Sequence, residues 1–115
     1  MYERLTQGVS LFNSGLFFEA HEAFEDLWRE EVGDTRLVYQ GLVQVCAGFV
    51  KLQRGQPGAA RVLMAKGLLK LEAAPRECWP PLLIADLSAQ VREAISALDQ
   101  GAAPALPVLR VPGGG

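Results

Sequence analysis

"TRLVYQGLVQVCAGFVKLQRG", residues 35–55, carries apolar side chains around almost the whole circumference of the helix that its spacing predicts. Only Gln40, Gln44 and Lys51 form a polar stripe along it. A helix that is apolar on nearly all sides is stable only when other elements cover it. We therefore expect residues 34 or 35 to 53 to form the central helix of a helical bundle.

Two glycines inside this helix predict a close helix–helix contact. Gly41 and Gly48 lie seven residues apart and so share one face, and each costs about 1 kcal/mol relative to alanine in a helix interior. Close approach of a neighbouring helix is the usual compensation. We expect the helix of residues 16–31 to cross there and to bring His21 or Glu25 toward Gln44.

Helical spacing recurs along most of the chain, and glycines or prolines separate the segments. The expected helices cover residues 2–13, 16–31, 34 or 35 to 53, 58–73 and 80–99. The expected fold class is all-α, a five-helix bundle built from two antiparallel helical hairpins, with tetratricopeptide-like pairing, plus a C-terminal helix. Residues 1–100 are expected to form a single helical bundle domain.

Residues 101–115, "GAAPALPVLRVPGGG", differ in character and are expected to form an extended tail. Prolines prevent a helix here, yet Leu106, Val108, Leu109 and Val111 make the segment too apolar for a plain linker. We expect it to lie along a groove, either on its own chain or on a neighbour's.

The composition excludes several classes of function. The chain has 115 residues, half of them hydrophobic, and a formal net charge of −2 with no basic stripe, so we expect neither nucleic-acid nor membrane binding. Cys46 and Cys78 lack metal-ligand spacing and are too few for a disulfide framework, which favours reduced thiols in the cytoplasm. No phosphate-binding glycine loop is present, and we expect no cofactor. The residues leave homo-oligomerisation open.

An internal repeat provides a comparison for the polar residues. Shifting the sequence by 40 residues aligns "LFNSGLFFEAHEAFEDLW" with "KLQRGQPGAARVLMAKGL", which predicts two similar hairpins. The matching pairs are Phe12 with Leu52, Gly15 with Gly55, Ala20 with Ala60, Phe24 with Met64, and Trp28 with Leu68. His21, Glu22 and Glu25 instead align with Arg61, Val62 and Ala65. The hairpin itself does not require an imidazole or carboxylates there.

The helix of residues 16–31 therefore carries the candidate site. His21 and Glu25 are one turn apart at the border of the apolar stripe, and Glu25 can also pair with Arg29. One interpretation is an ordinary polar cluster beside the core. The other is a pocket for a small ligand or a protein partner, best suited to a cationic or amine-bearing group. The expected lining consists of His21, Glu22, Glu25, Trp28, Gln40 and Gln44.

A metal-dependent, hydrolase-like enzyme is the alternative for the same place. "HEAFE", residues 21–25, resembles the first half of the zincin motif, but Glu25 stands where the second histidine belongs. His21, Glu22 and Glu25 are the candidate ligands, and the chain has no other histidine. We therefore expect no metal and prefer a non-enzymatic binding or interaction module.

The two motif regions together resemble the domain-of-unknown-function family 309, a small all-helical group of bacterial and archaeal proteins. The resemblance covers residues 8–71 and consists of a glycine, then F-F-E-A-H-E-x-x-E-x-x-W, then Q-G-L-x-Q. The matching residues are Gly15, Phe17, Phe18, Glu19, Ala20, His21, Glu22, Glu25, Trp28, Gln40, Gly41, Leu42 and Gln44. This resemblance implies a helical bundle without an assigned biochemical activity.

Overall fold

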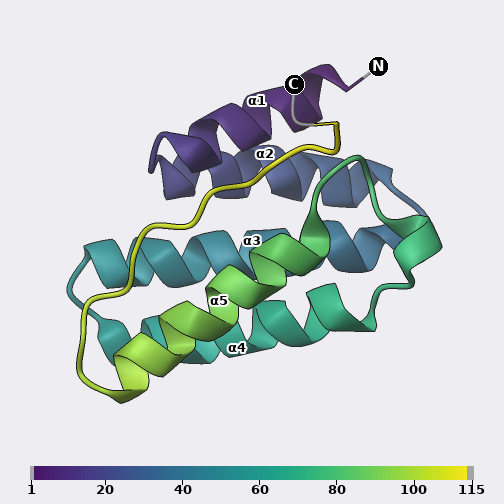
Figure 1. Cartoon of the computed structure of the whole chain (residues 1–115). Helices are drawn as coiled ribbons and strands as arrows, with labels where there is room; N and C mark the ends of the chain where they lie inside the picture. The colour runs from purple at the N-terminus through teal and green to yellow at the C-terminus, as the bar shows by residue number, and fades with distance from the viewer. Residues whose placement is uncertain (1, 114–115) are drawn as a thin grey trace.

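The computed structural model describes residues 2–113, and this part of the chain contains five α-helices (Figure 1). They are α1 (Glu3–Asn13), α2 (Phe17–Glu30), α3 (Thr35–Gln53), α4 (Pro57–Ala73) and α5 (Ile84–Asp99), with a short 3-10 helix, Arg76–Cys78, before α5. Residues 2–113 contain no strand, which confirms the expected all-α class. The pairs α1/α2 and α3/α4 run antiparallel and form the two expected hairpins (Figure 1).

The two hairpin turns have the same hydrogen bonds. In the first, Gly15 N–H donates to the Phe12 carbonyl at 3.0 Å and Leu16 N–H donates to the Leu11 carbonyl at 3.0 Å. Forty residues later, Gly55 and Gln56 repeat both bonds, to Leu52 at 3.0 Å and Lys51 at 2.9 Å. Both glycines have positive φ, 77° and 74°, as this helix-ending motif requires. The aligned glycines of the repeat therefore have equivalent structural roles.

The structural repeat of the two hairpins also includes a pair of core glycines outside the aligned stretches of sequence. A Cβ atom placed on Gly8 of α1 would lie 2.7 Å from the Phe24 ring, and one on Gly48 of α3 would lie 2.9 Å from Cγ of Met64. Phe24 and Met64 are both fully buried. In each hairpin, a glycine on the first helix therefore makes room for a large side chain sixteen residues later.

The glycine face of α3 is covered by α4, and the expectation that the helix of residues 16–31 would cross there is wrong. A Cβ on Gly41 would lie 3.0 Å from the Gly67 carbonyl oxygen, and one on Gly67 would lie 2.8 Å from the Gly41 carbonyl oxygen. These two glycines face each other and let the backbones of α3 and α4 come close. Helix α2 packs on another face of α3, where a stacked pair, Phe17 and Phe49, joins them with ring centroids 5.0 Å apart.

Helix α5 begins at Ile84, later than the expected start at residue 80. A proline disfavours helical backbone in the residue before it, and Trp79, which precedes Pro80, is extended. Pro81 disfavours helical backbone at Pro80 in the same way. Leu83 N–H then donates to the Arg110 carbonyl at 2.8 Å, outside the helix. The segment before α5 therefore pairs with the tail.

Residues 102–111 of the tail form neither helix nor strand and return along the bundle, between α1 and α5 (yellow in Figure 1). Leu109 is only 2% exposed and joins the core formed by the helices. Over residues 2–113, no helix is long and apolar enough to cross a membrane.

Candidate functional site

The polar cluster of α2 forms because the helix buries an adjacent stripe. Phe17, Ala20 and Phe24 face the core, which leaves His21 and Glu25 at its edge, with side chains 27% and 31% exposed. The His21 Nε2 atom lies 3.4 Å from Glu25 Oε2. The other oxygen of Glu25, Oε1, accepts a hydrogen bond from Arg29. One carboxylate thus bridges an imidazole and a guanidinium along a single helix face.

The second ring nitrogen of His21 has no partner. Its Nδ1 atom is buried and makes no hydrogen bond with any described residue. The imidazole lies beside Phe18, with ring centroids 5.8 Å apart. Because a buried polar atom without a partner destabilises the fold, this arrangement departs from an ordinary satisfied histidine.

A cleft of about 300 Å³ lies between α2 and α3 next to this cluster. Its lining consists of Glu25, Trp28, Gln40, Val43 and Gln44. The expected approach of Glu25 to Gln44 therefore occurs, although α2 does not pack on the glycine face of α3.

Two cationic side chains contact residues that line the cleft. Arg36 at the start of α3 lies over the Trp28 ring, 4.6 Å from its centroid, and its Nε donates to the Trp28 carbonyl at 3.1 Å. From α4, Lys70 Nζ donates to Gln44 Oε1 at 2.8 Å. One face of the Trp28 ring, where a cationic ligand would bind, therefore carries a cation of the protein itself.

The structure brings four of the six residues proposed from the sequence into this cleft: Glu25, Trp28, Gln40 and Gln44. His21 reaches it only through its contact with Glu25, and Glu22 is exposed and outside the lining. Sequence reasoning missed Val43, Arg36 and Lys70. Arg36 lies one turn before Gln40, so helical periodicity could have found it, whereas Lys70 depends on how α4 packs.

The candidate metal ligands do not form a metal-binding group. Among the described residues, no three histidine, cysteine, aspartate or glutamate side chains are close enough together to hold a metal ion. Glu22 is exposed, and Oε1 of Glu25 is engaged by Arg29. The His21–Glu25 pair therefore lacks a third ligand in residues 2–113.

Comparison with known protein families gives one match. The model of the family described as "Domain of unknown function (DUF309)" matches residues 5–63, about half of the chain. The chain belongs to the DUF309 family. No curated protein matches the chain. The family description assigns no activity.

The DUF309 match contains part of the site. Residues 5–63 include all five residues that line the cleft and also Arg36, whereas Lys70 and the tail lie outside them. The α2/α3 cleft is therefore formed within the family region, while one of its flanking cations comes from the adjoining part of α4.

Two buried titratable side chains of this DUF309 chain lie apart from the cleft. Burial raises the pKa of the Cys46 thiol well above its usual range. Burial, with smaller contributions from Glu31 and Tyr2, raises the pKa of Tyr39 to about 12. Both shifts mean that the folded state favours the neutral form.

We expect the protein to lose stability at alkaline pH, partly through Tyr39. Its folded pKa is above the unfolded value of about 10, so its contribution is fully present below pH 10 and is lost as pH rises through 12. The loss from this phenol is about 1 kcal/mol by about pH 11. Urea unfolding of the wild type and Tyr39→Phe at neutral pH and at that alkaline pH measures it. An equal alkaline loss in both proteins would contradict the assignment to Tyr39.

Proposed function

We propose that this protein is a non-enzymatic cytoplasmic binding module whose α2/α3 cleft binds an anionic group. A small carboxylate or an acidic side chain of a protein partner would supply the group. One observation carries this proposal: Arg36 and Lys70 both contact the lining of the cleft, and neither has an ion-pair partner among the described residues.

The two acidic side chains of α2 at this end of the cleft already share a cationic partner. Glu25 pairs with Arg29, which also contacts Asp26 with N and O atoms 3.3 Å apart. Among residues 2–113, the charges at the cleft without an ion-pair partner are therefore those of Arg36 and Lys70. This balance favours an anionic ligand over the cationic one expected from the sequence.

The geometry of Arg36 supports the same preference. Its Nε is used by the Trp28 carbonyl, which fixes the plane of the guanidinium and leaves its Nη groups without a hydrogen-bond partner among residues 2–113. Two parallel N–H groups match the two oxygens of a carboxylate. Trp28 and Val43 add an apolar wall that suits a flat hydrocarbon group.

The alternative of a metal-dependent enzyme has less support. A typical zinc site needs at least three protein ligands, and among the described residues no three histidine, cysteine, aspartate or glutamate side chains lie close enough together to hold a metal ion. We therefore place the ligand at Arg36 and Lys70, and assign the His21–Glu25 pair to the rim of the cleft.

A pair of matched probes tests the proposal. We expect phenylacetate to shift the Trp28 indole and the Gln40 and Gln44 side-chain amide signals in NMR spectra, with saturation in the millimolar range typical of such small ligands. Phenethylamine, with a similar aromatic body and opposite charge, should cause much smaller shifts. Arg36→Gln and Lys70→Gln should each weaken phenylacetate binding by about three- to tenfold, because each removes one charge-assisted contact.

Arg54→Gln is the control variant, because it removes a cation near the end of α3 that has no part in the cleft. It should leave the phenylacetate titration unchanged. Stronger shifts with phenethylamine than with phenylacetate, or no saturable shift with either probe, would reject an anion site.

A further inference from the structure

The tail is held by an arrangement that recognises an extended peptide backbone. The Gln90 side-chain amide from α5 binds both backbone groups of Val108: Nε2 donates to the carbonyl at 2.8 Å, and Oε1 accepts from the N–H at 2.8 Å. The Asn13 side chain from α1 binds Leu109 in the same way, with distances of 2.9 and 2.7 Å. Two carboxamides from opposite helices thus bind two successive residues.

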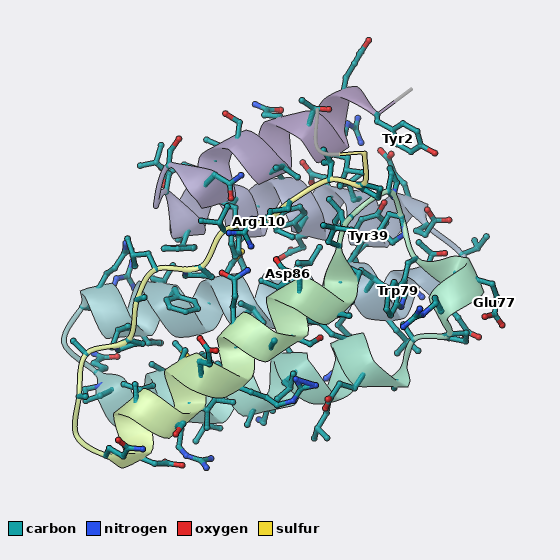
Figure 2. The ribbon with its side chains drawn as sticks, in the orientation of Figure 1. Tyr2, Tyr39, Glu77, Trp79, Asp86 and Arg110 are labelled. Carbon is teal, nitrogen blue, oxygen red and sulfur yellow. The ribbon has the colours of Figure 1, made fainter. Side chains whose placement is uncertain are left out.

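A third backbone contact and two side chains complete the recognition. Leu83 N–H donates to the Arg110 carbonyl, and Arg110 Nη1 lies 2.8 Å from Asp86 Oδ2. Figure 2 shows Arg110 and Asp86 next to each other, between the tail and α5. Leu109 is buried, so the groove recognises an extended backbone, an apolar side chain and a following cation.

The residues that connect α5 to this bound segment lack its polar contacts, although the side chain of Pro107 is buried. Ala102 N–H makes the last bond of the α5 turn, to Ala97 at 2.8 Å, and residues 103–107 make no hydrogen bond. A gap of about 260 Å³ separates this connection from α5. Pro104 and Pro107 favour an extended backbone in the connection. Nothing in the recognition itself requires that groove and segment belong to one chain.

The outward side of the bound segment is also unusual for a plain tail. Leu106, Val108 and Val111 are 57%, 39% and 45% exposed and lie on the described surface without cover.

From these contacts we propose that the groove between α1 and α5 is a peptide-binding site for an extended Pro-x-Leu-Arg segment, and that it exchanges its own tail for the tail of a second copy. The tail of each chain then occupies the groove of the other. Within one chain the short connection gives the tail an effective concentration in the millimolar range, so the closed single chain predominates in dilute solution.

Two complementary variants of the full chain test this exchange. A groove variant, Asn13→Ala with Gln90→Ala, keeps a normal tail but loses both carboxamides. A tail variant, Leu109→Asp, keeps a normal groove but cannot bury its own tail. Neither variant can bind its own tail normally. The wild-type tail of the groove variant, however, fits the wild-type groove of the tail variant. We expect each variant to sediment as a monomer and their mixture to form a one-to-one dimer.

NMR provides a second readout in the labelled tail variant. Adding the unlabelled groove variant should return the Asn13 and Gln90 side-chain amide signals to their wild-type positions. A triple variant with both sets of changes is the matched control for the groove variant. Its tail carries aspartate in place of the buried Leu109, so its affinity for the intact groove of the labelled chain should be at least about 100-fold weaker than that of the groove variant. A mixture that stays monomeric, with unchanged amide signals, would overturn the proposal.

Circular dichroism checks that both variants keep their helices before they are mixed. If Leu109→Asp loses its helices, Val108→Pro replaces it, because proline removes the N–H that Gln90 Oε1 accepts without introducing a charge. The same mixture and the same two outcomes then decide the question.

Discussion

Gly67→Val is expected to lower the free energy of unfolding by about 3 kcal/mol or more, which is large for a single substitution. A Cβ on Gly67 would lie 2.8 Å from the Gly41 carbonyl oxygen, 2.8 Å from Cγ2 of Val45 and 3.0 Å from the Val45 nitrogen. Two of these three atoms are backbone, which cannot turn away as a side chain can. The α3/α4 contact must open, and both central helices lose packing. Urea unfolding followed by circular dichroism measures the loss.

Alanine substitutions give a graded series with an internal control. Gly67→Ala should destabilise by roughly 1–3 kcal/mol, even though alanine favours a helix by about 1 kcal/mol. Gly58 lies in the same helix, and a Cβ there would meet nothing within 4 Å. Gly58→Ala should therefore be neutral or stabilising by up to about 1 kcal/mol. Equal effects at the two positions would show that α3 and α4 do not approach as closely as described.

Phe24→Ala is expected to destabilise the protein by about 3–5 kcal/mol, since it removes a fully buried ring from the first hairpin. Gly8, which packs against the Phe24 ring, allows a second test of the same contact. Gly8→Ala alone should destabilise, because its Cβ would lie 2.7 Å from the Phe24 ring. In the Phe24→Ala background the same change should be neutral or stabilising, because the new methyl group then enters the cavity and alanine favours the helix.

A double-mutant cycle measures this coupling. We expect the double variant to be more stable than the sum of the single effects predicts, by roughly 1–2 kcal/mol. Gly58→Ala serves again as the control, because it should show no coupling with Phe24→Ala. Simple additivity between Gly8 and Phe24 would mean that the ring does not pack on the glycine.

The sequence predicted the features that depend on neighbours along the chain. Helical periodicity identified all five helices, because the apolar positions repeat once per turn wherever a helix buries one face. Gly15 and Gly55 were located as hairpin turns, because a helix end with positive φ favours glycine whatever surrounds it. The His21–Glu25–Arg29 series followed from the same local geometry, since residues four apart meet on a helix surface.

Some predictions from local sequence were wrong because a residue far away in the sequence contacts the segment. Proline at residues 80 and 81 indicated a helix start, but the backbone of Leu83 pairs with Arg110, and α5 begins at Ile84. Gly41 and Gly48 indicated a close contact, but not that Gly67 of α4 would provide it. Glycines on one helix face indicate that the backbone of another helix packs closely there. Which helix does so depends on the volumes of all the surrounding side chains.

The sequence by itself therefore determined the helices, their order, their turns and the charged face of α2, because each of these arises within a few residues. Only the tertiary structure decided that Lys70 reaches Gln44, that Arg36 covers Trp28 and that neither cation has an ion-pair partner within residues 2–113. It also decided that Asn13 binds Leu109, 96 residues away, and that Gln90 completes the groove for the tail. These contacts depend on how the helices rotate and pack against one another, and that arrangement is fixed by the core as a whole.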